Sequence, residues 1–120
     1  LPLSGAVIVT TPQTAAVNVA KRGARMFNSV NVPLLGVVEN MSYLENPETG
    51  DRQFIFGQGG GERTAISLET AFLGSVPLDE KIRVGGDSGI PIVIGHPESE
   101  AAESIRKIAS KIWSQLSQEN

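Results

Sequence analysis

The chain alternates between short apolar runs and longer segments in which apolar residues recur every three or four positions. The runs span residues 6–11, 34–38 and 71–76 and are rich in aliphatic residues. Such runs are typical of parallel strands buried on both faces, whereas the longer spacing is typical of helices with one buried face. The alternation predicts an α/β fold of three layers, with a mostly parallel sheet between helices.

Two helices are predicted between these runs. The first is expected from Pro12 to about Phe27, with Thr11 as its N-cap, and the second from Arg63 to about Thr70. The residues expected to face the sheet are Ala16, Val19, Ala20, Gly23, Phe27, Ala65, Ile66 and Leu68.

The clearest helical pattern begins after Ser99, a predicted N-cap. An amphipathic helix with one Trp also suits a membrane surface, but such helices are usually rich in Lys and Arg. Here Glu100 and Glu103 offset the basic residues, so the pattern favours a helix that covers the sheet. Its expected buried face is Ala101, Ala102, Ile105, Ile108, Ala109, Ile112, Trp113 and Leu116.

Shorter elements are predicted in the connecting segments. Pro47 and Gly50 indicate a tight reversal, and Pro91 argues against a central strand around it. The predicted elements are a short returning strand at 53–56, one helical turn at 80–84, a loop at 85–89 and a strand-like segment at 90–94.

The composition narrows the class of protein. With 120 residues the chain is one domain at most, and three strands make up only about half of a doubly wound sheet. Residues 1–5 lead almost directly into a strand without an initiator Met, so we expect the chain to begin inside a domain.

The net charge and the cysteine content exclude several kinds of binding partner and ligand. A net charge of −3 argues against a nucleic-acid partner, and the lack of cysteine excludes disulfides and thiolate metal ligands from within the chain. No signal peptide and no run of about 18 apolar residues is evident. We therefore expect a soluble, cytoplasmic protein without a membrane partner.

Polar residues 39–42 follow the second apolar run, where that strand leaves the sheet. Ligands of open α/β sheets bind at the carboxyl ends of strands, and the carboxamide of Asn40 offers a donor and an acceptor that suit an adenine edge. A turn role, in which Asn40 bonds nearby backbone, is the alternative that the local sequence favours.

Glycines 57 and 59–61 precede the second predicted helix. Glycines before a helix can bind phosphate through free backbone N–H groups. This segment lacks the Gly-Lys-Ser/Thr ending of a Walker A loop, and Glu62 would repel a phosphate. The sequence therefore favours a flexible turn.

Several motifs, taken together, resemble one family. They are Thr10-Thr11-Pro12-Gln13, Gly36-Val37-Val38-Glu39-Asn40-Met41-Ser42-Tyr43, Ile55-Phe56-Gly57 with Gly59-Gly60-Gly61-Glu62, Leu73-Gly74-Ser75-Val76-Pro77-Leu78, and Pro97-Glu98-Ser99. In order and spacing they are similar to the Mrp/ApbC/Nbp35 family, P-loop ATPases of the ParA/MinD superfamily that are linked to carrying iron–sulfur clusters. The resemblance covers nearly the whole chain.

The resemblance implies a MinD-like P-loop NTPase fold of which residues 1–120 are the C-terminal portion, an incomplete half-domain. The Walker A loop and Walker B strand would precede this portion. The complete protein would use ATP and Mg²⁺, form a homodimer and deliver clusters to iron–sulfur client proteins. The implied roles are adenine bonding for Asn40, contact with the adenine ring for Pro77, Leu78 and Asp79, and a place near the phosphates or the dimer partner for Thr11, Pro12 and Gln13. For Asn40, this implication overrides the turn role.

The chain departs from the family pattern at one point. Many relatives carry Cys-x-x-Cys after Met-Ser-Tyr, where paired chains are thought to hold a cluster, and the aligned positions here are Asn46 and Thr49. Neither supplies a thiolate for iron, which counts against a cluster at this place. A family variant with Pro-x-Thr-Gly at this point exists.

Three functions remain in competition. The resemblance favours an ATP-dependent iron–sulfur carrier or assembly factor. A MinD/ParA-like partitioning ATPase is the second, and a non-enzymatic interaction module is the third if the chain acts as it stands.

Overall fold

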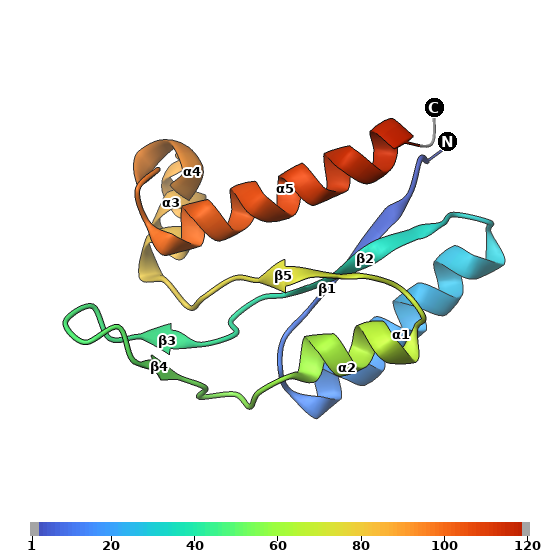
Figure 1. Cartoon of the computed structure of the whole chain (residues 1–120), viewed down its shortest axis with the longest axis horizontal. Helices are drawn as coiled ribbons and strands as arrows, with labels where there is room; N and C mark the ends of the chain where they lie inside the picture. The colour runs from blue at the N-terminus through green and yellow to red at the C-terminus, as the bar shows by residue number, and fades with distance from the viewer. Residues whose placement is uncertain (1–2, 119–120) are drawn as a thin grey trace.

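The structure is a computed structural model in which residues 3–118 are described, except for the side chains of residues 14–17 and 118. The first part of the chain holds the strands with two helices between them, and the last part, after β5, is helical (Figure 1). The elements are β1 (Ala6–Thr10), α1 (Thr14–Ser29), β2 (Leu34–Glu39), β3 (Leu44–Glu45), β4 (Arg52–Gln53), α2 (Gly60–Ser67), β5 (Phe72–Ser75), α3 (Glu80–Ser88), α4 (Ile92–Gly95) and α5 (Glu100–Gln118).

The main sheet of the described chain has the order β1-β2-β5, and both pairings are parallel. The register places Ile8 beside Val37 and Val37 beside Phe72. The short strands β3 and β4 form a separate antiparallel hairpin. The predicted parallel sheet is therefore confirmed, and residues 6–11, 34–38 and 71–76 supply its strands.

Helices cover both faces of this sheet. On one face α1 and α2 bury Ala24 and Ala65 against Ile8 and Val37. On the other face α5 buries Ile108 against the strands, and Figure 1 shows α5 on the side opposite α1 and α2. The three-layer prediction is confirmed, and α3 and α4 pack against the first turns of α5. Among residues 3–118 no helix is long and apolar enough to cross a lipid bilayer.

Two helices differ from their predicted bounds. Helix α1 begins at Thr14 rather than Pro12, because Gln13 is still extended, and Thr11 is not the N-cap. Helix α2 begins at Gly60, inside the glycine segment, because the small glycines let its first turn approach the rest of the fold closely.

Residues 85–94 differ most from the prediction. The expected loop is the second half of α3, which ends at Gly89 in the left-handed conformation with φ 78°. Gly85 admits the backbone of Ile90, because an added Cβ would lie 2.4 Å from the Ile90 carbonyl oxygen. The strand-like segment is instead the short helix α4, in which Ile92 is buried against α5.

Four residues predicted to face the sheet are exposed. They are Val19 (64% exposed), Ile66 (77%), Ala109 and Trp113 (72%), whereas Ala24, which was not predicted, is buried. A helix of 3.6 residues per turn has a wider apolar stripe than the sheet can cover, so residues at its margin stay in solvent. The side chain of Ala16 lies outside the described residues.

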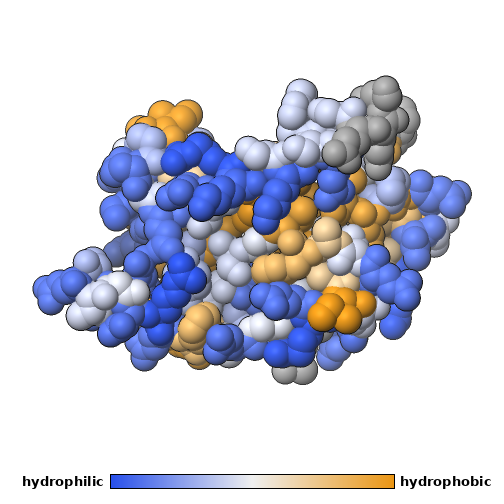
Figure 2. Space-filling model, in the orientation of Figure 1, coloured by the Kyte–Doolittle hydropathy of each residue, from blue (hydrophilic) through white to orange (hydrophobic). Residues whose placement is uncertain are grey.

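The two edges of the sheet differ in the side chains that cover them. On the side of β5, Lys111 Nζ of α5 donates to the Leu73 carbonyl oxygen at 3.0 Å, and Gln115 of α5 donates to the carbonyl of Leu35, on the central strand β2, at 2.8 Å. Figure 2 shows this side, where apolar side chains lie between the polar surfaces of α5 and α2. At the β1 edge, an open hollow of 460 Å³ is lined largely by apolar residues, and Val9 is 63% exposed.

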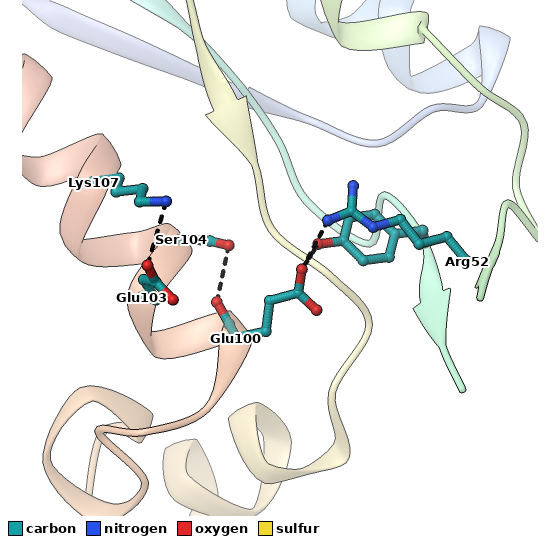
Figure 3. A network of polar contacts seen from close by, with 6 residues as sticks. Arg52, Glu100, Glu103, Ser104 and Lys107 are labelled. Carbon is teal, nitrogen blue, oxygen red and sulfur yellow. Dashed lines mark hydrogen bonds and ion pairs between the residues drawn. The ribbon is translucent and has the colours of Figure 1, made fainter. Parts of the chain in front are cut away.

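A polar network fastens the hairpin to α5 (Figure 3). Glu100 Oε1 accepts hydrogen bonds from Tyr43 Oη and from the Arg52 guanidinium, both at 2.8 Å. The guanidinium carbon of Arg52 also lies 4.2 Å from the centre of the Tyr43 ring. Burial, followed by the bond to Glu100, raises the pKa of Tyr43 to about 12.

Tyr43 is the only tyrosine, so the ultraviolet absorbance of its phenolate reports this network alone. We expect the folded chain to titrate near pH 12, against 10 for the ordinary phenol. Since the raised pKa belongs to the folded state, its contribution to stability is complete below pH 10 and is lost as the pH rises toward 12. In Glu100→Gln the midpoint should fall toward 10, and a parent midpoint of 10 would contradict the described contacts.

The isolated chain should self-associate through the β1 edge or be marginally folded. Among the described residues β1 is paired on one side only, and an apolar unpaired edge is a template for another chain. Light scattering at about micromolar concentration tests this.

The matched variant is Val9→Lys, which places a charge on that edge and should reduce association. A sharp, cooperatively melting parent monomer would show that the edge is already closed.

Candidate functional site

The carboxyl ends of β1 and β2 lie side by side. Thr11 follows β1, and Asn40 follows β2. The Asn40 backbone N–H donates to the Thr10 carbonyl at 2.7 Å, which joins the two strand ends. Both Asn40 and Thr11 border the 460 Å³ hollow. Asn40 is half-buried, and its carboxamide makes no hydrogen bond to the described part of the chain.

The turn that follows β2 is held by backbone hydrogen bonds to the end of β5. Val76 N–H donates to the Glu39 carbonyl at 2.8 Å, and Ser42 N–H donates to the Val76 carbonyl at 3.0 Å. Between them Met41 is in the left-handed region, with φ 54°, which is uncommon for a residue with a side chain. The backbone around Asn40 is therefore fixed at both ends.

The residues predicted to contact the adenine ring follow β5 directly. Leu78 N–H donates to the Tyr43 carbonyl at 2.7 Å, and the Asp79 carboxylate caps α3 by accepting from Lys81 N–H at 2.9 Å. Pro77, Leu78 and Asp79 line a hollow of 370 Å³ shared with the hairpin. This hollow is separate from the one that Asn40 borders.

Thr11, Pro12 and Gln13 connect β1 to α1. The Thr11 hydroxyl lies 3.4 Å from Gln13 Oε1, and Gln13 is exposed. Pro12 is buried under the start of α2, where a Cβ on Gly60 would lie 2.6 Å from the Pro12 carbonyl oxygen. Of these three residues, only Thr11 borders the hollow beside Asn40.

The sequence analysis missed the role of Glu39. This residue is 3% exposed, and its Oε1 accepts from Gly61 N–H, in the first turn of α2, at 2.7 Å. Its Oε2 accepts from the Ser42 hydroxyl. A signal was present in the sequence, because a carboxylate that ends a buried strand needs buried donors, and the glycines 22 residues later provide one.

Glu39 also decides the role of the glycine segment. The N-terminus of a helix attracts anions, and in α2 this position holds the Glu39 carboxylate. Gly61 is needed for the contact, because a Cβ there would lie 2.7 Å from Glu39 Cβ. The geometry fits the turn interpretation and leaves the first turn of α2 without a place for phosphate.

The positions aligned with the cluster cysteines lie at the tip of the hairpin. Asn46 Oδ1 accepts from Glu48 N–H at 2.9 Å, and Thr49 Oγ1 accepts from Asp51 N–H at 3.2 Å. Both side chains thus stabilise the turn between β3 and β4. Among the described residues, no three His, Cys, Asp or Glu side chains are grouped in a way that could hold a metal ion.

The chain is similar to proteins that carry iron–sulfur clusters. An iron-sulfur cluster carrier protein of Synechocystis is 48% identical over 98% of this chain. The iron-sulfur cluster transfer protein NUBPL of Dictyostelium discoideum is 45% identical over 97% of it. The chain spans only about a third of these relatives, 33% and 36% of their lengths.

Solved structures agree on the fold. The cell division ATPase MinD of Pyrococcus furiosus matches 93% of this chain and 43% of its own, with a TM-score of 0.71 and 24% identity. A nucleotide-binding protein of Archaeoglobus fulgidus in complex with ADP matches 81% of this chain and 39% of its own, with a TM-score of 0.65 and 32% identity. The predicted MinD-like fold class is confirmed.

A family model described as ParA, NUBPL iron-transfer P-loop NTPase, matches residues 1–113. The match covers nearly the whole chain and agrees with the resemblance seen in the motifs. The chain therefore belongs to the ParA family of NUBPL-type iron-transfer P-loop NTPases.

Proposed function

We propose that this chain is the C-terminal portion of a P-loop NTPase domain and forms the adenine-binding side of an ATP-dependent iron–sulfur cluster carrier. "The complete protein" below means this chain joined to a preceding portion with the Walker A and Walker B motifs. Its cargo is an iron–sulfur cluster, and it acts as a homodimer that passes the cluster to client proteins.

The proposed binding of the adenine base rests on the environment of the Asn40 carboxamide. Asn40 is half-buried, its side chain makes no hydrogen bond to the described residues, and it lies at the carboxyl end of β2, where it borders one end of the hollow along the β1 edge. One amide can donate to and accept from an adenine edge at the same time. The amide of Asn40 therefore suits the base of ATP, with Thr11 beside it and with Pro77, Leu78 and Asp79 after the neighbouring strand β5.

Asn40 suits the base of ATP, and Thr11, Pro12 and Gln13 would lie near its phosphates or the dimer partner, whereas the first turn of α2 offers no place for phosphate. Phosphate and Mg²⁺ would be held by the preceding portion, since the N-terminus of α2 already holds Glu39. When bound, ATP supplies the phosphoryl group that is hydrolysed. The contribution of this chain is to bind and orient the adenine through Asn40 and to place the hairpin relative to it.

The cargo assignment rests on the relatives. Relatives that are 44–48% identical to this chain are named iron-sulfur cluster carrier proteins. The MinD structures are only 20–24% identical to it. A partitioning ATPase is thus the weaker alternative. Since Asn46 and Thr49 offer no thiolate, we place the cluster elsewhere than at the hairpin tip.

The isolated 120-residue chain should have no ATPase activity. Phosphoryl transfer requires a P-loop lysine and a Mg²⁺-binding Ser or Asp, and the glycine segment lacks this set. Phosphate release by the purified chain should equal that of a buffer blank, while the complete protein should exceed it. Turnover by the isolated chain would refute the proposed division of labour.

Replacing the amide tests the base contact directly. In the complete protein, Asn40→Ala should lower the affinity for ATP tenfold to a hundredfold, because losing a buried hydrogen-bond partner costs about 1–3 kcal/mol. Isothermal titration with ATP and GTP measures the change, and GTP binding should be little affected. Asn46→Ala, which removes an exposed amide of the hairpin, is the matched control. If Asn40→Ala binds both nucleotides as the parent does, Asn40 is a turn residue only.

A further inference from the structure

The carboxylate of Glu39 bridges two segments that are far apart in the sequence. One oxygen is bonded to the backbone of α2 at Gly61, and the other to the hydroxyl of Ser42. We name these three residues the Glu39 bridge. Since Asn40 and Met41 lie between Glu39 and Ser42, the bridge closes a short loop around the residue proposed to bind adenine.

The Glu39 bridge adds a side-chain link to a turn whose ends are already held by backbone hydrogen bonds. Met41 has φ 54°, a conformation that an L residue adopts at a cost and keeps only when its surroundings enforce it. Backbone hydrogen bonds hold the two ends of the loop, and the Ser42–Glu39 bond joins those ends through side chains. Loss of this bond should leave Met41 and the Asn40 carboxamide held by the backbone hydrogen bonds alone, with a less defined direction of the carboxamide.

The bridge is also rigid on the side of α2. Glu39 is 3% exposed, and its contact to Gly61 N–H is 2.7 Å long. A carboxylate at the N-terminus of a helix is stabilised by the helix dipole. The ring of Phe72 packs against Gly61, because its Cε1 would lie only 2.9 Å from a Cβ added there. The carboxylate therefore has a defined place, and Ser42 is held through it.

We propose that Glu39 is a positioning residue for nucleotide selectivity: it fixes the direction of the Asn40 carboxamide through Ser42 and anchors it to α2 through Gly61. This inference rests on the proposed adenine contact of Asn40. Glu39 itself touches no nucleotide, so its replacement changes the preference for adenine over guanine without changing the affinity for phosphate.

The test compares variants of the complete protein in their affinities for ATP, GTP and inorganic triphosphate. Ser42→Ala removes one bond of the bridge and leaves Glu39 in place, so it should fold and should lower the preference for ATP over GTP about threefold to tenfold. Glu39→Ala should lower it further. Glu39→Gln should retain most of the preference, because its amide oxygen accepts from Gly61 N–H and its amide nitrogen donates to Ser42. Triphosphate affinity should stay unchanged in all three.

A double-variant cycle separates positioning from general structural damage. If Ser42 acts through Asn40, then Ser42→Ala should have no further effect on selectivity in an Asn40→Ala background. Glu62→Gln, which changes the exposed carboxylate next to Gly61, is the matched control and should behave as the parent.

Each outcome bears on one of the two proposals. If Asn40→Ala keeps the parent selectivity, the adenine contact is refuted and the role of Glu39 falls with it. If Asn40→Ala loses selectivity while Ser42→Ala keeps it, the adenine contact stands and the Glu39 inference is overturned. Additive losses in the double variant overturn it as well. Should Glu39→Ala fail to fold, the Ser42→Ala cycle decides the question alone.

Discussion

The structure depends on one buried carboxylate. Glu39 ends the central strand with 3% of its surface exposed, and a buried charge without partners would be strongly destabilising. Its partners are the backbone of α2 and the Ser42 hydroxyl, so the position of α2 and the shape of the turn after β2 are set together. These two contacts of Glu39 therefore help to shape the surface at the carboxyl end of the sheet, where Asn40 lies.

The glycines of the chain serve this close packing. Gly60 and Gly61 let α2 approach Pro12 and Glu39 to distances that a Cβ would prevent. A glycine-rich segment before a helix suggests phosphate binding when only the sequence is considered. Here the same chemistry of free N–H groups is satisfied by a side chain from the neighbouring strand. The helix dipole stabilises that carboxylate as it would stabilise a bound anion.

The two edges of the main sheet differ in what lies beside them. On the side of β5, Lys111 of α5 donates to the Leu73 carbonyl. The β1 edge has no such cover among the described residues, and its apolar hollow meets Asn40 at one end. A strand added beside β1 would therefore also border the proposed adenine site.

The sequence by itself determined the strands, the α/β class and the family. Residues 6–9 and 34–38 are apolar runs of the kind typical of buried parallel strands, and the motif around Asn40 carries the resemblance. Local patterns failed where the partner of a segment is distant in the chain. Residues 90–94 look like a strand, but Ile92 is buried against α5 and no neighbouring strand is there to pair with among the described elements. The role of Glu39 was likewise decided only by tertiary structure, because its partner Gly61 lies 22 residues away and becomes a neighbour only when α2 packs on the sheet.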